Sequence, residues 1–409
     1  MVPEGWKLVT IGDLTSSHSY GPRFSAKDYH VDGTVKTIRN TDVTETGEIL
    51  YKQVPSAHLD SEIIEQHKLK TGDLVIITTA DCGLSAIFEE QDIAYIPSAY
   101  AVRYRLNQTV LPTFIKYFMH TRIAQKQVGQ FIRKGTVANL PGSDVLKIKV
   151  ALPPLPEQKK IAAILSSVDE AIASTQAVIE QTRKVKQGLL QQLLTRGIGH
   201  TRFKESAIGE IPESWEVDEL AKVARVIDCK HRTPEYVESG FPVVRPRDIK
   251  EGALDLSGCL RTTKQDYEDL IENHCPSVGD IIYSRNATFG VAAIVETNEP
   301  FTVGQDVCII VGKILIGRLL FYLLNSRIIK LQIDKLSAGS TFQRINLKDI
   351  RRFFVPVIPE DEQKEIVAIA DSITEQIKTS EAQLHHLHEI KRGLMQDLLT
   401  GHVRVGGTP

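Results

Sequence analysis

The feature that most constrains this chain is an internal repeat with a spacing of about 205 residues. The segment QKKIAAILSSVDEAI begins at Gln158 and returns as QKEIVAIADSITEQI from Gln363, and KQGLLQQLLT at 186–195 returns as KRGLMQDLLT at 391–400. Because the matches keep one order and nearly one offset, they predict two copies of one fold in a single chain. Three further pairs are TGDLVI at 71–76 with VGDIIY at 278–283, IRNTDV at 38–43 with VRPRDI at 244–249, and VPEGW at 2–6 with IPESW at 211–215.

The first part of each copy mixes short β-branched runs with turn residues. Runs such as 73–79 and 305–311 predict strands, and the stretch 113–132 predicts helix between them. This mixture is typical of a mixed α/β globule, so we assign the chain to the α+β class. A proline cluster closes each globule, at 151–158 and 355–363, and predicts a stiff, extended exit.

A long helix is predicted after each proline cluster, because apolar residues recur there with heptad spacing and no proline interrupts them. Each helix carries one late glycine, Gly188 and Gly393, and we expect the two helices to end at these matching places. Two such stripes favour a coiled coil; the alternative is that each helix packs on its own globule. A stripe sustained over five heptads exceeds a small globule's surface. The expected seam residues are Ile161, Leu165, Val168, Ile172, Ile179, Leu189, Leu193, Ile366, Ile373, Ile377, Leu384, Leu387, Leu394 and Leu398.

A repeat that ends in a long helix has a mechanical consequence. About 38 helical residues span roughly 55 Å at a rise of 1.5 Å each. One turn of B-DNA is about 34 Å long. Two similar globules held apart by such a rod could contact DNA at two places, with unread DNA between them.

Composition excludes several classes of protein. The chain is 42% hydrophobic and 24% charged, with a net charge of −2, whereas a self-sufficient DNA-binding protein usually carries a basic excess. DNA binding therefore requires local basic loops or a field supplied by partner chains. Five cysteines without a C-x-x-C pair argue against disulfides and zinc and fit a reducing cytoplasm. We expect neither a signal peptide nor a membrane span.

The motifs of common DNA-modifying chemistry are missing from the sequence. The doublet Pro153-Pro154 lacks the preceding Asn or Asp and the following aromatic residue of an adenine-methylase loop, and no phosphate loop is present. The strings Glu157-x-Lys159 and Glu362-x-Lys364 fit acidic charge at a helix start better than a nuclease metal site. We therefore expect no catalytic residue, metal or cofactor. His385, His386 and His388 do not form a metal site, because their spacing does not put the three imidazoles on one side of a helix.

The sequence resembles the DNA-specificity subunits of type I restriction-modification systems along nearly its whole length. The resemblance rests on PEGW at 3–6, on the proline-then-EQ junctions, on KQGLLQQLLTRGIG and on the bridge TRFKESAIGEIPESW at 201–215. It implies two target-recognition domains, each reading one half of a bipartite, asymmetric site in double-stranded DNA. It also implies an antiparallel pair of helices that sets the spacer and docks methylase subunits, two being expected, onto which restriction (translocase) subunits assemble. The turn GTVANLPGS at 135–143 departs from GSTFQRINL at 339–347, because it lacks the Gln.

Polar, glycine-punctuated loops recur at matching places in both halves and are the candidates for reading DNA. Bases are read by Arg, Lys, Asn and Gln, and phosphates are also held by Ser and Thr. A solvated loop or a structural cap is an equally good interpretation of any single loop; Asp42 and Asp248, for instance, could simply hold Arg39 and Arg245. The candidates are Tyr20, Arg23, Arg39, Asn40, Thr78, Thr79, Lys134, Thr136, Asn139, Lys230, His231, Arg232, Arg245, Arg247, Ser284, Arg285, Asn286, Ser340, Thr341, Gln343 and Arg344.

These arguments predict five segments and one function. The segments are a first target-recognition domain at 1–152, a helix at 153–198, a second domain with its entry linker at 199–356, a helix at 357–402 and a tail at 403–409. The predicted function is a non-catalytic, DNA-reading subunit in the cytoplasm of a bacterial or archaeal cell. Two other hypotheses stay open: a DNA-modifying enzyme with an unrecognised active site, and a coiled-coil scaffold that binds no DNA.

Overall fold

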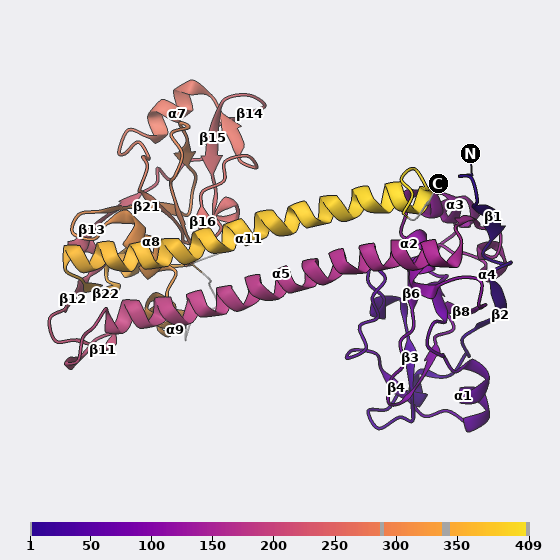
Figure 1. The fold of residues 1–409 in the computed structure, drawn as a ribbon. Coiled ribbons are helices and arrows are strands. Elements are labelled where there is room, and N and C mark those ends of the chain that lie inside the picture. The colour runs from indigo at the N-terminus through magenta and orange to yellow at the C-terminus, as the bar shows by residue number, and fades with distance from the viewer. Residues whose placement is uncertain (1, 287–289, 338–343, 406–409) are drawn as a thin grey trace. The chain divides into compact units, whose positions relative to one another are not determined.

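The computed structural model describes residues 2–286, 290–337 and 344–405 (Figure 1). The chain forms two compact units: unit 1 comprises Met1–Gln176 and Ala382–Pro409, and unit 2 comprises Ala177–Glu381. Each unit contains one globule together with a segment of each of two long helices, α5 (Leu155–Arg196) and α11 (Glu360–Thr400).

The globule of unit 1 is built on a four-stranded sheet of order β2-β8-β5-β6 and a three-stranded sheet of order β4-β3-β7, with β1 and β9 paired separately. Its elements are β1 (Lys7–Thr10), β2 (Thr15–Tyr20), η1 (Ala26–Asp28), β3 (Val35–Ile38), η2 (Asn40–Asp42), β4 (Ser56–Ala57), α1 (Ser61–His67), β5 (Leu74–Ile77), β6 (Ser85–Ile87), β7 (Ala94–Pro97), β8 (Ala101–Leu106), α2 (Pro112–Met119), α3 (Arg122–Phe131), α4 (Gly142–Val145) and β9 (Lys149–Leu152).

The globule of unit 2 has a five-stranded sheet of order β13-β21-β18-β19-β16, a four-stranded sheet of order β14-β17-β15-β20, the pair β12-β22 and the hairpin β10-β11. Its elements are β10 (Phe203–Ser206), β11 (Gly209–Pro212), β12 (Glu216–Glu219), α6 (Leu220–Val223), β13 (Ala224–Asp228), β14 (Tyr236–Val237), β15 (Phe241–Val244), η3 (Pro246–Asp248), β16 (Gly252–Ala253), β17 (Leu260–Thr262), α7 (Lys264–Leu270), β18 (Ile281–Ser284), β19 (Ala292–Ile294), β20 (Thr302–Val303), β21 (Val307–Gly312), α8 (Gly317–Leu324), α9 (Arg327–Ser337), α10 (Leu347–Arg351) and β22 (Phe354–Val357).

The two globules share a strand order, with the edge strands β16 and β14 added in unit 2, and this confirms the repeat predicted from the sequence. The order β2-β8-β5-β6 in unit 1 returns as β13-β21-β18-β19 in unit 2, and β4-β3-β7 returns as β17-β15-β20. The predicted strands at 73–79 and 305–311 form β5 and β21, whose apolar residues lie in the core. The predicted helical stretch 113–132 forms two helices, because the Thr121 side chain accepts a hydrogen bond from the backbone N–H of Ala124 and so begins α3.

The long helices pair in antiparallel fashion within each unit. In unit 1 the start of α5 shares a core with the end of α11, through Ile161, Leu165 and Leu398, and Lys391 Nζ lies 2.6 Å from Asp169 Oδ1. In unit 2 the end of α5 shares a core with the start of α11, and Arg183 Nη2 lies 2.6 Å from Glu381 Oε1. Figure 1 shows α5 (magenta) and α11 (yellow) side by side.

All fourteen predicted seam residues are buried or half-buried. Their assignment to one continuous seam stays a prediction. The helix-packing alternative also holds at the ends of the stripe, where Ile161 and Ile366 enter the core of a globule. The expected ends at Gly188 and Gly393 were wrong, because both helices continue for another two turns. Each helix ends instead before a glycine in the left-handed region, Gly197 (φ 63°) and Gly401 (φ 70°), which terminates a helix without a steric penalty.

Buried side chains at each helix start tie the helix to its globule in the same way in both units. The Trp6 indole donates to Glu157 Oε2 (3.1 Å), and the Trp215 indole donates to Glu362 Oε2 (2.8 Å). The next residues, Gln158 and Gln363, are each 1% exposed and satisfy one backbone N–H and two backbone carbonyls of their units. The expectation of acidic charge at these helix starts is confirmed, and both carboxylates are also indole acceptors.

In unit 1 the C-terminal tail joins this helix start. Arg404 donates from Nε and Nη2 to the Glu157 carboxylate, at 2.8 and 2.9 Å, and from Nη1 to the carbonyl of Glu4 at 2.7 Å. In unit 2 the corresponding partner of Glu362 is His200, whose Nε2 lies 2.9 Å from Glu362 Oε1. Within the described ranges, no helix combines the length and apolar character that a membrane span needs.

Candidate nucleic-acid interface

Three segments of unit 1 meet at one loop tip. Thr79 and Asn139 form an isolated antiparallel bridge, and the backbone N–H of Leu140 donates to the carbonyl of Thr78 at 2.8 Å. The backbone N–H of Thr78 in turn donates to the carbonyl of Tyr100 at 2.8 Å. The loop after β5, the loop before β8 and the loop after α3 are therefore fixed to each other by backbone hydrogen bonds.

Unit 2 builds the same tip from the equivalent segments. Asn286 and Arg344 form the isolated bridge, the backbone N–H of Ile345 donates to the carbonyl of Arg285 at 2.9 Å, and the N–H of Arg285 donates to the carbonyl of Asp306 at 2.9 Å. Position by position, these are the hydrogen bonds of unit 1. The tip is thus a repeated part of the fold.

The side chains on the second tip are gathered by one carboxylate. Asp306 Oδ1 lies 2.7 Å from Arg344 Nη2, and Asp306 Oδ2 accepts from Asn286 Nδ2 at 3.2 Å. The backbone of Asp306 has φ 62°, which non-glycine residues rarely adopt and which Asn and Asp tolerate best. At the corresponding place in unit 1, Tyr100 is 60% exposed.

A second repeated feature is an arginine held side-on by an aspartate. Arg39 donates from Nε and Nη2 to the two oxygens of Asp42, at 3.0 and 2.9 Å, and Arg245 donates in the same way to Asp248, at 2.8 and 3.0 Å. Hydrogen bonding to the carboxylate raises the pKa of both guanidinium groups. The expectation that these aspartates hold the arginines is confirmed. The pairing leaves Arg39 40% exposed and Arg245 16% exposed.

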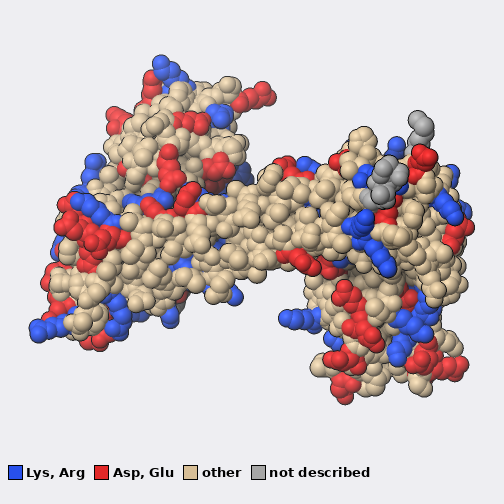
Figure 2. Space-filling model, viewed as in Figure 1, with Lys and Arg blue, Asp and Glu red and all other residues tan. Residues whose placement is uncertain are grey.

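The basic loop at the front of unit 2 is neutralised by acids of the same unit. Lys230 Nζ lies within 2.8 Å of carboxylate oxygens of both Asp269 and Glu272, and Arg232 pairs with Asp266 and Asp269. These bonds raise the pKa of the lysine and arginine side chains and lower that of the two aspartates. Figure 2 shows the same interspersion of Lys and Arg with Asp and Glu on the face that it draws.

Comparison with known proteins identifies what this repeated architecture is. The family described as Type I restriction modification DNA specificity domain matches residues 3–183 and 212–389, once in each half of the chain. The chain belongs to this family.

Relatives of this family cover the chain from end to end. The type I restriction enzyme MjaIX specificity subunit of Methanocaldococcus jannaschii is 20% identical over 424 residues, covering 99% of this chain and 95% of the relative. The MjaVIII specificity subunit of the same organism is 30% identical over 267 residues, covering 63% of each chain. A chain from a solved structure concerned with assembly of a type I restriction-modification system superimposes with a TM-score of 0.63 at 19% identity, covering 98% of this chain and all of the other.

Three of the candidates do not offer their side chains to a ligand. Thr78 is 1% exposed and donates from Oγ1 to the carbonyl of Tyr100, and Ser284 is fully buried and donates to the carbonyl of Asn286. Arg285, which we expected on the DNA-facing surface, is 4% exposed; it donates from Nη1 to Asp228 Oδ1 at 2.8 Å and from Nε to the carbonyl of Ile345. That expectation was wrong, because the half-buried Asp228 carboxylate and the tip backbone use the guanidinium.

The correction changes what substitution of Arg285 should do. We expect Arg285→Met to lower the free energy of unfolding by about 1–3 kcal/mol, because Asp228 then lacks its charged partner. The DNA sequence that the complex methylates should be unchanged. Urea unfolding measures the loss of stability. The matched control is the double variant Arg285→Met with Asp228→Asn, which should recover part of the lost stability. An Arg285→Met chain of wild-type stability that loses specificity would return Arg285 to the reading surface.

The other candidates lie at or near the surface. Arg247 is 69% exposed at its side chain, and Thr79 and Asn40 are partly exposed, with Asn40 donating to Asp81. The Tyr20 hydroxyl is used by the fold, since it accepts from the backbone N–H of Gly142 at 2.7 Å. Exposed side chains are those of Arg23, Lys134, Thr136, Asn139, His231, Arg232, Asn286 and Arg344. The candidates Ser340, Thr341 and Gln343 lie outside the described residues.

Sequence reasoning missed several residues of this surface. Tyr100 and Asp306 are equivalent positions only when the two halves are aligned at an offset of 206, and the sequences around them show no similarity. Tyr29 and Tyr236 were also missed; they are 37% and 42% exposed. Burial raises the pKa of the Tyr29 phenol, with the charge of nearby Arg39 opposing it, and the phenol of Tyr236 acts electrostatically on Arg245. An exposed tyrosine beside an Arg–Asp pair is therefore another repeated feature.

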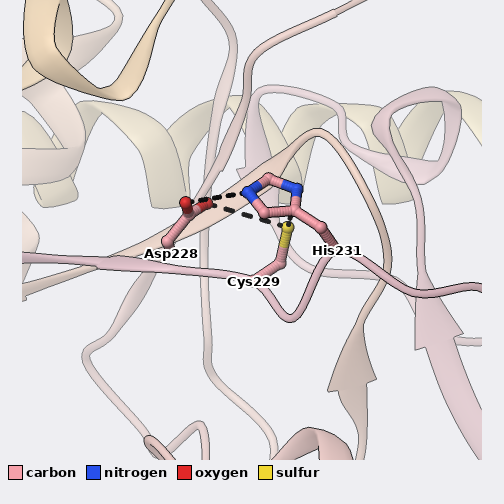
Figure 3. A group of neighbouring side chains, drawn as sticks. All are labelled: Asp228, Cys229 and His231. Carbon is pink, nitrogen blue, oxygen red and sulfur yellow. Dashed lines mark hydrogen bonds and ion pairs between the residues drawn. The ribbon is translucent and has the colours of Figure 1, made fainter.

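A group of Asp228, Cys229 and His231 is the one set of three neighbouring metal-ligand types among the described residues (Figure 3). His231 Nε2 lies 3.0 Å from Asp228 Oδ2, and Cys229 Sγ lies 4.0 Å from His231 Nδ1. Asp228 also binds Arg285, and a structural zinc site takes four ligands, so this group does not fit one. Burial raises the pKa of the Cys229 thiol, whereas a nucleophilic cysteine needs a lowered pKa.

Proposed function

We propose that this chain is the DNA-reading subunit of a type I restriction-modification complex, with each globule recognising one half of a bipartite, asymmetric site. One observation carries the proposal: the chain builds the same three-segment loop tip twice, once in each match to the DNA specificity family. A duplicated tip with different exposed side chains suits two half-sites of different sequence.

The proposed contact surface of each globule is the tip together with the neighbouring exposed loops. Bases are read by two-pronged donors and acceptors, which Asn139, Asn286 and Arg344 carry. Phosphates are positioned by cations and hydroxyls such as those of Arg23, Lys134, Thr136 and Arg247. Because many of the arginines and lysines are already paired with acids, the net charge of −2 leaves much of the attraction for DNA to partner chains.

We propose that two methylase subunits dock on the helix pair, one per unit, and that restriction subunits assemble on the methylases. Each unit has a groove beside the C-terminal part of one long helix, α11 in unit 1 (about 1080 Å³) and α5 in unit 2 (about 740 Å³). Lys391, Met395 and Gln396 line the first groove where Lys186, Leu190 and Gln191 line the second. A repeated groove supports two copies of one partner.

The chain takes no catalytic part in this proposal and binds no cofactor of its own. Among the described residues, the group of Asp228, Cys229 and His231 has a thiol whose pKa is raised by burial and an aspartate engaged by Arg285, which supports a structural role for it. We infer that the chain works in the cytoplasm of a bacterial or archaeal cell, where its proposed DNA ligand and methylase partners would be.

The decisive test is to map modified adenines in cells that carry the chain with its methylase and restriction partners. We expect one motif made of two short specified sequences separated by unspecified bases, and loss of that motif when this chain alone is deleted. Methylation by the purified chain without partners would favour the alternative of an enzyme. Unchanged methylation after deletion, with no DNA binding by the complex, would favour a scaffold.

A further inference from the structure

We propose that three equivalent positions on the repeated tip determine the bases that each globule reads: Thr79, Tyr100 and Asn139 in unit 1, and Asn286, Asp306 and Arg344 in unit 2. This inference rests on the proposed function, since it assigns specificity within that same surface. Within it, Asp306 is a positioning residue that aims the two donors of the second tip.

The backbone hydrogen bonds of the tip are the constant part. The bridge and both backbone hydrogen bonds occur in each unit, with donor–acceptor distances of 2.8 Å in unit 1 and 2.9 Å in unit 2. The residue beneath the tip is buried in both, although it is a threonine in one and an arginine in the other: Thr78 is 1% exposed and Arg285 is 4% exposed. Both link segments of the tip through a side-chain hydrogen bond to a backbone carbonyl, Thr78 to Tyr100 and Arg285 to Ile345.

The side chains above this backbone are the variable part. A hydroxyl, a phenol and an amide in unit 1 are replaced by an amide, a carboxylate and a guanidinium in unit 2. If the three positions served only folding, their identical backbone partners would favour similar residues in both copies. The backbone conformation also differs at the middle position, where Asp306 has φ 62° and Tyr100 does not have a positive φ. Different side chains on the same backbone hydrogen bonds are what two readers of different half-sites require.

The chemistry of the second tip favours a purine-rich step with a guanine. Arg344 is 44% exposed, and the ion pair of its Nη2 with Asp306 is the one that the described residues show for it. Arginine reads guanine through O6 and N7, and asparagine reads adenine through N6 and N7. Asp306 holds Arg344 and Asn286 at 2.7 and 3.2 Å, so one carboxylate orders both side chains before DNA arrives.

The first tip lacks a cation at these positions. Asn139 is the donor–acceptor fork there, and Tyr100 adds an exposed aromatic face. Asparagine favours adenine, and neither threonine nor tyrosine supplies the guanine fork of an arginine. We therefore expect the first half-site to lack the guanine contact that Arg344 makes in the second.

The test uses the complete complex in cells and reads the methylated motif. Arg344→Asn should reduce the preference for guanine at one position of the second half-site by about 5- to 150-fold and leave the first half-site unchanged. Asp306→Asn, which tolerates the same left-handed backbone, should relax that position and the one read by Asn286 together. Arg352→Asn, at an exposed arginine outside the tip, is the matched control and should leave the motif as it is.

The outcomes separate this inference from the function on which it rests. A wild-type complex that methylates no bipartite motif overturns the proposed function. A bipartite motif that stays the same in both Arg344→Asn and Asp306→Asn overturns the inference alone. Loss of methylation at every site by variants with wild-type urea unfolding, or a change in the first half-site, would also overturn it, because a base contact acts at its own position.

Discussion

Exchange of residues 1–152 for the matching globule of another family member is expected to replace one half of the methylated motif and leave the other half intact. The physical reason is that the globule of unit 1 has its own hydrophobic core, centred on residues such as Leu74, Tyr104 and Phe114, and its own loop tip. Sequencing of modified adenines in cells with the complete system measures both halves at once.

The exchange must preserve the contacts that join the globule to its helix. Trp6 donates to Glu157, and Gln158 binds backbone groups at Thr109 and Leu111. The replacement globule therefore needs a tryptophan at position 6 and the same backbone turn at 109–111. A matched control is the same exchange with Trp6→Phe, which should lose stability without changing the motif. Simultaneous change of both halves of the motif would refute independent reading.

Lengthening both long helices by four residues is expected to widen the unread spacer by about two base pairs while both half-sites keep their sequences. Insertion after Gln176 in α5 and after Glu381 in α11 adds roughly 6 Å of helical rise to each. At 3.4 Å per base pair, this corresponds to about two base pairs of DNA. The modified-adenine motif reports the spacer directly.

Insertion in only one helix is the control for this experiment. It leaves the pairs Lys391–Asp169 and Arg183–Glu381 unable to keep one common register, so reduced stability or methylation is expected. Inserts of two residues in both helices rotate the apolar stripe away from its partner and should behave likewise. Methylation with an unchanged spacer in the matched four-residue variant would show that the helices do not set the distance.

The parts of the fold that follow local periodicity were predictable from the sequence. The heptad stripe from Ile161 to Leu193 needs only the order of apolar residues, and the equivalence of the halves needs only their shared letters. The helix ends were not, because Gly188 sits on an open face of α5, where nothing lies within 4 Å of an added Cβ, and so does not interrupt the helix. Gly197, with φ 63°, ends it.

The sequence predicts which loops form the candidate site, but it does not predict which of their side chains are exposed and which are paired inside the fold. Arg285 looked like a surface arginine because its partner Asp228 lies 57 residues earlier and only the tertiary fold brings them together. Arg39 and Asp42 are three residues apart, so their pairing could be read locally. Tyr100 and Asp306 stand out only when the structure shows which loops share a tip.

The bond between Arg404 and Glu157 has a consequence for the order in which the protein folds during synthesis. The ribosome delivers the chain from its N-terminus, and domains generally fold as they emerge. Unit 2 is one uninterrupted stretch, Ala177–Glu381, whereas unit 1 needs residues from both ends of the chain. Unit 1 is therefore complete only after Leu398 and Leu399 have joined its core and Arg404 has bound Glu157, so the half that is made first is the half that is finished last.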